Sequence, residues 1–399
     1  MPSEGKAGDA APRHHLLSFA ALSASYFAHI GFFNPYLSLW LKDLGFGLLA
    51  ISVLGSVQSA TRLFAPYAWG WLSDHSGERV KLLRYGATAA MLLSLGLWLE
   101  PGAVPLFFLL LLMFTHTSGM MPMSEAALAH LVSEGGAFDA RRYGRVRLWG
   151  SLGFLLTVTA AGWWFEHRGM GDFPAWTLAT LGAVALSSWW LPDHREPMPA
   201  NAVARPPIWP VLRQPAVRWL LASAFFHVLA HIFIYVFFSL YLDSLGYSKS
   251  TIGILWAVSV VVEISWFFTQ GRWLPRLPLT GWLLLAAVLM TVRMVITAGA
   301  PLVWPLLLLA QALHAVTFAT HHTVCIALVS HHFPGRLRGR GQALYTVVAY
   351  GSSGILGGLA GGLISSRWGL GTVFWVSAAC ALVASLCAWR LMRIEHASR

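Results

Sequence analysis

Residues 38–46 have the sequence SLWLKDLGF, and residues 239–247, which lie 201 positions further along the chain, have the sequence SLYLDSLGY. The same offset aligns Gly70 with Gly271 in the apolar stretches that follow. It also aligns Arg62 with Glu263, and each is the only charged residue inside its stretch. The repeat predicts that the chain consists of two structurally equivalent halves.

The composition is typical of a membrane protein. Of the 399 residues 57% are hydrophobic and only 11% are charged, whereas soluble domains contain about 25% charged residues. Apolar runs of about 20 residues recur along the whole chain, which predicts an all-α integral membrane fold. We expect twelve transmembrane helices in two pseudo-symmetric six-helix bundles. The predicted spans are 15–41, 48–72, 81–99, 104–132, 145–166, 174–191, 217–242, 250–270, 280–299, 303–330, 343–366 and 372–391.

A proline-rich connection separates the two halves, because prolines disfavour a regular helix and suit a semi-rigid linker. The predicted parts are a tail over 1–14, a bundle over 15–191, a linker over 192–216, a second bundle over 217–391 and a tail over 392–399. Parallel six-helix repeats with a substrate site at their interface are typical of one large class of secondary transporters.

Lysine and arginine residues predict the orientation. With the N-terminus inside, the outer connections contain only Lys42, Arg168, Lys249 and Arg367 of the 27 basic residues. The positive-inside rule therefore predicts that both termini are cytoplasmic, in a bacterial inner membrane. The net charge of +11 then reflects topology and indicates no nucleic-acid partner. We expect the lipid bilayer as the surroundings and a monomer as the assembly.

Residues 122–154, PMSEAALAHLVSEGGAFDARRYGRVRLWGSLGF, place an acid and a base inside two apolar helices. Gly135 and Gly136 mark a turn, and Glu125 precedes it by about as many residues as Arg147 follows it. A charge in hydrocarbon costs roughly 3 kcal/mol or more and is tolerated mainly beside a partner or a watery cavity. The alternative is that both side chains extend to the nearby cytoplasmic surface.

We single out two acids and three arginines inside the predicted spans as candidates: Glu125, Glu263, Arg62, Arg147 and Arg293. A cavity with one positive charge in excess favours an anionic substrate, because a guanidinium can donate two hydrogen bonds to a carboxylate. For Arg62, a fixed structural pair is an equally good interpretation.

Histidine supplies a second class of candidates. His314 lies in the middle of the tenth span, beside the span that contains Arg293, and histidine titrates near neutral pH. It could therefore carry a coupling proton, or it could be a hydrogen-bonded packing residue. Tyr26, His29 and His231 could contact a substrate ring, although aromatic residues at helical spacing more often belong to the core.

Residues 70–81, GWLSDHSGERVK, form a predicted inner loop in which an acid can cap a helix end while basic residues stay in water. Its marker residues are Gly70, Asp74, Gly77, Arg79 and Lys81. Such a loop can latch the halves in one state. The alternative is a loop that only fixes the topology.

This loop resembles the loop motif of the major facilitator superfamily. Further stretches resemble the phenylpropionate permease family within it, and the resemblance covers essentially the whole chain. They are YGRVRLWGS (143–151), VEI (262–264), VR (292–293), LHAVTF (313–318), QALY (342–345) and VFWV (373–376). The resemblance implies import of an aromatic monocarboxylate, such as 3-phenylpropionate, by alternating access.

A more distant resemblance to lactose permease implies roles for individual residues. It implies that Glu125, Arg147 and Glu263 bind substrate, while Arg293 and His314 belong to the proton site. Thr317 stands where that transporter has its proton-carrying acid, so the proton must be carried by Glu263, His314 or Glu125, or coupling is absent. We rank Glu263 first for the proton.

The sequence predicts a proton symporter of a small organic solute and no enzyme. Cys325, Cys380 and Cys387 have no metal-ligand spacing, and no cofactor, metal site or catalytic constellation is expected. Two alternatives within transport remain open: a sugar or nucleoside proton symporter, and an exporter of a hydrophobic compound. A membrane receptor without transport is the alternative from a different class.

Overall fold

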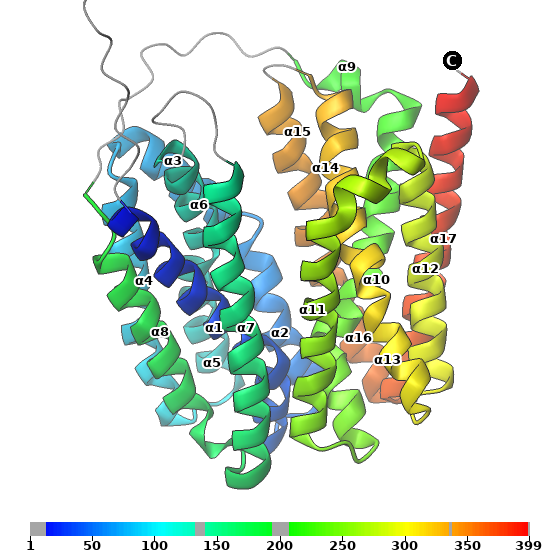
Figure 1. Ribbon diagram of the computed structural model, residues 1–399. Helices are drawn as coiled ribbons and strands as arrows, with labels where there is room; N and C mark the ends of the chain where they lie inside the picture. Colours follow the sequence, from blue (N-terminus) through cyan, green and yellow to red (C-terminus); the bar gives the residue numbers. More distant parts are fainter. Residues whose placement is uncertain (1–12, 132–139, 194–206, 335–336, 398–399) are drawn as a thin grey trace, which may run out of the picture. The chain divides into compact units, whose positions relative to one another are not determined.

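A computed structural model describes residues 13–131, 140–193, 207–334 and 337–397. In these ranges the regular structure is helical and contains no strand (Figure 1). Eleven helical stretches of the described chain are long and apolar enough to span a membrane. The sixth predicted span forms α8 (Phe173–Trp189), which has 17 residues. The predicted all-helical membrane fold is confirmed, and the count of twelve spans is approximate.

The first half of the chain contains the predicted spans as single or paired helices. Gly135 and Gly136, the predicted turn between α6 and α7, lie outside the described residues. The elements are α1 (Arg13–Asp43), α2 (Leu48–Thr61), α3 (Ala65–Ser76), α4 (Arg79–Ser94), η1 (Leu95–Leu99), α5 (Ala103–Ser118), α6 (Met120–Leu131), α7 (Ala140–Arg168), η2 (Met170–Asp172) and α8.

The second half begins with a single helical turn in the predicted linker, where Pro210 occupies an early position that needs no N–H donor. The elements are α9 (Trp209–Leu212), α10 (Pro215–Ser244), α11 (Lys249–Trp273), η3 (Leu274–Arg276), α12 (Leu279–Gly299), α13 (Trp304–Ala312), η4 (Ala315–Thr320), α14 (His321–His332), α15 (Arg338–Tyr345), η6 (Thr346–Ser352), α16 (Ser353–Trp368) and α17 (Leu370–Ala397).

The second predicted span is interrupted at Arg62, between α2 and α3. Pro66 explains the break, because it has no N–H to donate to the carbonyl group of Arg62 four residues earlier. The equivalent helix of the other half, α11, continues without interruption through Glu263. The two repeats therefore differ in backbone at the position where their charges also differ.

Two spans of the second half contain π-helical segments, η4 and η6. A π-helix is rare, occurs mostly as a single turn within an α-helix, and is frequent at functional sites. His314 immediately precedes η4, and Tyr345 immediately precedes η6.

The chain divides into two compact units that do not coincide with its two halves. One unit comprises residues 1–33, 64–157 and 172–200, and in it α4 packs against α5, α6 and α8. The other comprises residues 34–63, 158–171 and 201–399. The domain boundaries derived from the sequence stay a prediction.

The second unit has its core among α10, α12, α14 and α17, which contribute buried residues such as Leu220, Leu283, Leu328 and Leu391. The helices α10, α12 and α17 run side by side (Figure 1). In the same unit α2 packs closely on α16, because α16 presents glycines to it. A Cβ atom at Gly358 would clash with the side chain of Ser56.

The repeat appears directly in two turns. Gly45 has φ = 84° and Gly246 has φ = 87°, a conformation that favours glycine. The amide of Phe46 donates to the carbonyl of Leu41 at 3.1 Å, and the amide of Tyr247 donates to that of Leu242 at 3.0 Å. Each turn thus ends its helix with the same backbone geometry at an offset of 201 residues.

Candidate functional site

Glu125 on α6 and Arg147 on α7 form an ion pair between Oε1 of the acid and a terminal guanidinium nitrogen. Their side chains are 37% and 39% exposed. The guanidinium also lies over the ring of Phe27, with 5.2 Å from its central carbon to the ring centroid. The structure therefore brings these two predicted residues together, and the pair is accessible.

Glycines on α7 explain why Arg147 reaches Phe27 on α1. A Cβ atom at Gly153 would lie 2.9 Å from the backbone carbonyl carbon of Ala24. A Cβ atom at Gly150 would lie 2.7 Å from Oγ of Ser23. Because neither glycine has a side chain, α7 approaches α1 closely at this level.

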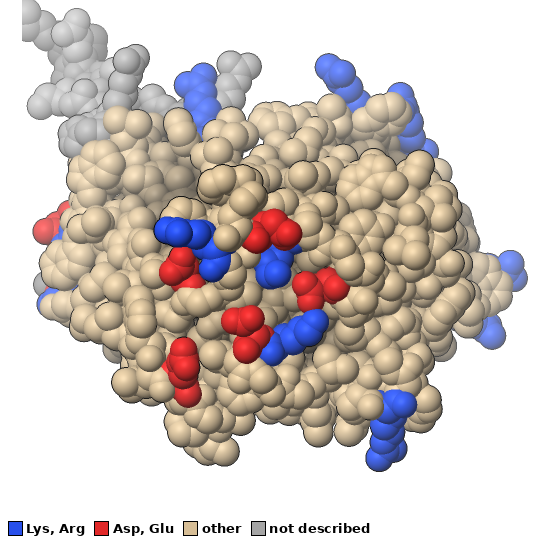
Figure 2. All heavy atoms as spheres, turned by 90° about the horizontal axis from the view of Figure 1, so that it is seen from below, with Lys and Arg blue, Asp and Glu red and all other residues tan. Residues whose placement is uncertain are grey.

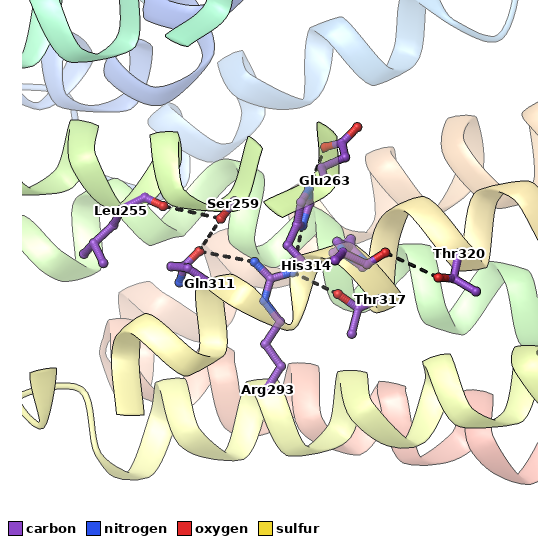
Figure 3. A network of polar contacts seen from close by, with 10 residues as sticks. Leu255, Ser259, Glu263, Arg293, Gln311, His314, Thr317 and Thr320 are labelled. Atoms are coloured by element: carbon purple, nitrogen blue, oxygen red, sulfur yellow. Dashed lines mark hydrogen bonds and ion pairs between the residues drawn. The ribbon is translucent and has the colours of Figure 1, made fainter. Parts of the chain in front are cut away.

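Arg293 on α12 lies at the centre of a buried polar cluster, which we call the Arg293 network (Figure 3). One terminal nitrogen, Nη1, lies 3.0 Å from Nδ1 of His314, 3.2 Å from Oγ1 of Thr317 and 3.4 Å from Nε2 of His231. The other, Nη2, donates to Oε1 of Gln311 at 3.3 Å. The members of the network are Arg293, His314, Glu263, Thr317, His231, Gln311 and Ser259.

The network continues to two residues of α11. Nε2 of His314 lies 3.2 Å from Oε2 of Glu263, and Oγ of Ser259 donates to Oε1 of Gln311 at 2.8 Å. In Figure 3 the carboxyl group of Glu263 lies at the far end of His314 from Arg293. The side chain of Glu263 is 21% exposed and that of His314 only 7%. Glu263 is therefore the more accessible member of this contact.

The donor inventory fixes the protonation pattern of His314. A guanidinium has only N–H donors, so Nδ1 of His314 must accept from Arg293 and must carry no proton. The remaining ring proton is then on Nε2, where it donates to the Glu263 carboxylate. Arg293 thereby orients His314 toward Glu263.

The acceptors around Arg293 do not match its N–H groups one to one. Nη1 has two hydrogens for three acceptors, while Nε is buried without a partner in the described part of the chain. The guanidinium is 1% exposed, and no acid side chain of the described residues forms an ion pair with it. Arg293 and Glu263 are connected only through His314.

The π-helix η4 contributes a further contact. Nε2 of His227 donates to the carbonyl oxygen of Thr317 at 2.7 Å. The ring of His227 stacks on that of His321 at 3.6 Å between centroids. These histidines belong to the packing of η4, and they flank the network without contacting Glu263.

Tyr26, His29 and His231 lie in different surroundings. His29 is 5% exposed, and its Nδ1 lies 3.0 Å from Oγ1 of Thr180. Tyr26 is half-buried, and its hydroxyl donates to the carbonyl of Thr117 at 3.4 Å. His231 belongs to the Arg293 network. A substrate contact for each of the three stays a prediction.

Arg62 follows the last residue of α2 and is half-buried. No acid among the described side chains forms an ion pair with Arg62.

The predicted gating loop forms the end of α3 and the start of α4. Gly77 ends α3 with φ = 67°, and Nε of Arg79 donates to Oγ of Ser73 at 2.9 Å. Lys81 pairs with Glu78 at 3.0 Å. The side chain of Asp74 lies outside the described part of the structure. Gly70 lies in open space, because a Cβ atom added there would meet no other atom within 4 Å.

An ion pair joins the two repeat turns. Nζ of Lys42 lies 2.7 Å from Oδ2 of Asp243, and these residues are 201 positions apart. Nearby, the hydroxyl of Tyr36 donates to the carbonyls of Val158 and Lys249, each at 3.1 Å. Acidic and basic side chains lie close together on the face drawn in Figure 2. A contact between equivalent residues is expected where a pseudo-two-fold axis passes.

Sequence reasoning placed Glu125, Arg147 and Glu263 in one site. The ion pair belongs to the unit containing residues 64–157, and Glu263 belongs to the other unit. Their convergence stays a prediction. No group of three or more His, Cys, Asp or Glu side chains among the described residues is arranged so that it could hold a metal ion.

Several polar and aromatic residues were not singled out from the sequence: Ser259, Gln311, Phe318, His322 and Tyr350. Of these, only Phe318 and His322 carried a sequence pattern, since they follow His314 by four and eight residues and so share one helix face with it. The contacts of Ser259 and Gln311 depend on the packing of α11 against α13.

The sequence matches the MFS_1 like family over residues 17–376. It is 28% identical over 393 residues to the maltose permease of Geobacillus stearothermophilus, covering 96% of this chain and 94% of that protein. It is 29% identical over 374 residues to a probable 3-phenylpropionic acid transporter of Escherichia coli (strain K12), covering 90% and 93% respectively.

Solved structures support the fold. A mutant form of the nucleoside transporter NupG matches with a TM-score of 0.83 and 16% identity, covering 94% of this chain and 99% of that one. A D-xylose-proton symporter matches with a TM-score of 0.68 and 14% identity, covering 94% and 98% respectively. At these identities the likeness concerns the fold alone.

Proposed function

The chain belongs to the MFS_1 like family of the major facilitator superfamily, and from this premise we propose that it imports a small aromatic monocarboxylate together with a proton. It is a multi-pass membrane protein and a secondary transporter, and it is not an enzyme. The substrate class and the proton are the proposed part. We further propose a monomer in a bacterial inner membrane with both termini in the cytoplasm, on the basis of the basic residues of its connections.

The observation that carries proton coupling is the ordered contact from Arg293 through His314 to Glu263. His314 cannot easily accept a second proton, because that proton would have to sit on Nδ1, which faces the Arg293 guanidinium. Glu263 is free of this restriction and is more accessible. We therefore assign the transported proton to Glu263 and an orienting role to His314 and Arg293.

The presence of a threonine at position 317 fits the assignment of the proton to Glu263. Its hydroxyl accepts a hydrogen bond from Arg293, so a neutral side chain satisfies the arginine at the position where lactose permease has an acid. An acid there would compete with Glu263 for the proton and for the arginine. Its absence leaves Glu263 as the carboxylate of the network.

For the substrate, Arg147 supports a carboxylate. Its ion pair with Glu125 is partly exposed, and an exposed pair contributes only about 0–1 kcal/mol to stability. A substrate carboxylate can therefore replace Glu125 as the partner of the guanidinium at small cost. Glu263, Tyr26, His29, Arg62 and His231 complete the proposed set of substrate-binding residues.

For the conformational cycle, we propose that the loop with Gly70, Asp74, Gly77, Arg79 and Lys81 acts as a latch. Arg79 fastens the start of α4 to the end of α3 through Ser73. Gly77 allows the sharp turn between these helices through its positive φ. The loop would act on gating without contacting the substrate.

A sugar or nucleoside symporter is the second candidate. The maltose permease among the relatives favours it, as does the acid–arginine pair, which can also bind hydroxyl groups. Export of a hydrophobic compound is the third candidate.

The test is uptake into proteoliposomes of labelled 3-phenylpropionate, maltose and uridine, each with and without an inwardly directed proton gradient. We expect the gradient to drive accumulation of the aromatic acid and no uptake of the other two. An uncoupler that collapses the proton gradient should abolish the accumulation. Accumulation of maltose or uridine instead would overturn the proposed substrate class, and gradient-independent uptake would overturn the coupling.

A further inference from the structure

The hydroxyl group of one buried tyrosine connects the two halves of the chain. Tyr36 on α1 is 0% exposed, and its hydroxyl lies 3.1 Å from the carbonyl oxygens of both Val158 and Lys249. Val158 belongs to α7, in the first half, and Lys249 is the first residue of α11, in the second. A phenol has one hydrogen, so the two carbonyl groups share it. Tyr36 is thus fixed between a helix of each half.

Two glycines make room for this hydroxyl. A Cβ atom at Gly162 of α7 would clash with the hydroxyl of Tyr36 and lie 2.8 Å from the carbonyl oxygen of Lys249. A Cβ atom at Gly253 of α11 would clash with the same hydroxyl and lie 2.6 Å from the carbonyl oxygen of Val158. The helices α7 and α11 therefore approach each other this closely because both residues lack a side chain.

An acid of the first half supports the same contact at the start of α11. The amide of Lys249 donates to Oε2 of Glu166 on α7 at 2.6 Å. The first amides of a helix have no acceptor within the helix, and the positive end of the helix dipole favours an acid beside them. The amide and the carbonyl group of Lys249 are thus both bound by side chains of the first half, Glu166 and Tyr36.

The equivalent aromatic residue of the repeat has no hydroxyl. The offset of 201 residues aligns Tyr36 with Phe237 on α10. Phe237 is also 0% exposed and also packs against a glycine, since a Cβ atom at Gly361 of α16 would lie 2.8 Å from Cζ of its ring. The repeat therefore conserves the buried ring and the glycine beside it, whereas only Tyr36 can donate a hydrogen bond.

The contacts of Tyr36 connect the first half to the second at one end of the helices. Residues 34–63 and 158–171 of the first half belong to the same compact unit as the whole second half. Lys42, which pairs with Asp243, lies in the first of these segments. On the proposed topology this end faces the outside. A transporter with two six-helix repeats must separate them on the side that opens, so these contacts must break in the outward-open state.

We propose that Tyr36, supported by Glu166, is the clamp that holds the two halves closed on the outer side. In the outward-open state its hydroxyl leaves the carbonyl groups of Val158 and Lys249, and water replaces it. A hydrogen bond that is exchanged for one to water contributes little net free energy, which makes the clamp reversible. The proposal rests on the proposed topology and alternating access, and it depends on neither the substrate nor the proton.

The experiment measures the distance between two spin labels by electron paramagnetic resonance, in proteoliposomes without substrate. The labels are attached to Asp43→Cys and Ser244→Cys, which are exposed, equivalent positions of the two repeat turns. The protein without these substitutions corrects for labelling of its own three cysteines. We expect a short distance to dominate, because Lys42 and Asp243 beside the labels are in contact. A predominantly long distance would overturn the proposal.

Tyr36→Phe in this doubly labelled protein keeps the ring and removes the shared hydrogen. We expect the ratio of short to long distances to fall about two- to tenfold, which corresponds to the net contribution of one hydrogen bond. An unchanged ratio would overturn the clamp.

Tyr247→Phe is the matched control. The hydroxyl of Tyr247 donates to the carbonyl oxygen of Pro301 at 2.8 Å, so this substitution also removes a tyrosine–carbonyl hydrogen bond, but within the second half. We expect the ratio of distances to stay unchanged. An equal shift in Tyr36→Phe and Tyr247→Phe would show a general loss of stability and would overturn the clamp.

A larger shift is expected from Gly253→Ala, because the added methyl group overlaps with the carbonyl oxygen of Val158 and keeps α7 and α11 apart. The long distance should then dominate. Gly271→Ala on the same helix meets no atom within 4 Å and should leave the distances unchanged. A short distance in Gly253→Ala would overturn the proposal. Because no substrate is present, failure of the proposed aromatic-acid import would leave all these distances unaffected.

Discussion

The two acid–arginine groups of this protein differ in their exposure and in whether the arginine contacts its acid directly. Arg147 contacts Glu125 directly, and both side chains are more than one third exposed. Arg293 is 1% exposed, and it reaches Glu263 only through His314. The first pair can exchange a partner with little loss, whereas the second arginine cannot leave its acceptors without exposing unsatisfied polar groups. This difference underlies the assignment of substrate to Arg147 and of proton control to Arg293.

The two regions also differ in backbone geometry. Around Arg147 the chain is a regular α-helix whose glycines bring α1 close. Immediately after His314 the helix changes to π-helical geometry, and the carbonyl oxygen of Thr317 accepts a hydrogen bond from Nε2 of His227. Arg293 itself lies on the regular helix α12, so the irregular backbone belongs to its partners His314 and Thr317.

The largest effect is expected from Glu263→Gln. The amide cannot carry a proton, so accumulation driven by a proton gradient should fall to the equilibrium level, while counterflow exchange persists. Both are measured with labelled substrate in proteoliposomes. Glu125→Gln is the matched control, because it removes the acid of the other group and should leave gradient-driven accumulation detectable. Full accumulation by Glu263→Gln would exclude that residue as the proton carrier.

Next in size is Arg147→Lys. An ammonium keeps the charge but cannot form two parallel hydrogen bonds to a carboxylate, and a hydrogen bond to a charged group contributes about 1.5–3 kcal/mol. We therefore expect the exchange KM to rise roughly 10- to 100-fold. Arg145→Lys, at an exposed position two residues earlier, should change it little. An unchanged KM in Arg147→Lys would argue against a direct substrate contact.

A smaller effect, on stability, distinguishes Gln311 from Thr317, which are both hydrogen-bond acceptors of Arg293. Gln311→Leu removes the acceptor of Nη2 and should lower the free energy of unfolding by about 1–3 kcal/mol, since a buried donor is left unsatisfied. Thr317→Val should cost less, because two other acceptors remain for the two hydrogens of Nη1. Thermal unfolding in detergent gives the comparison, and the reverse order would contradict this hydrogen-bond assignment.

The smallest effect is expected at Lys42 and Asp243. Their side chains are 51% and 21% exposed, and pairs of this kind contribute about 0.2–1 kcal/mol. Lys42→Ala should therefore lower the thermal midpoint slightly, and added salt should reduce the difference. The exchanged pair, Lys42→Asp with Asp243→Lys, should restore stability. A loss unaffected by salt would point to packing as the cause.

Much of this description follows from sequence. The apolar runs form helices because a backbone in hydrocarbon must satisfy its own hydrogen bonds. The offset of 201 residues predicts the equivalent turns at Gly45 and Gly246, which have matching φ values. The family follows from short motifs over the whole chain. The charged residues inside the spans were identifiable because each is costly there.

The tertiary structure determined which partners these charged side chains have. Periodicity cannot reveal that Arg293 has more acceptors than hydrogens at Nη1, since Arg293 and His231 each lie on a different helix from the segment with His314 and Thr317. Nor can it reveal the π-helix at η4, which depends on the surrounding packing. Sequence alone determined which residues are too polar for the membrane, because that cost is a property of each side chain. Only the fold decided their partners, because hydrogen bonds require atoms from distant segments to meet within about 3 Å.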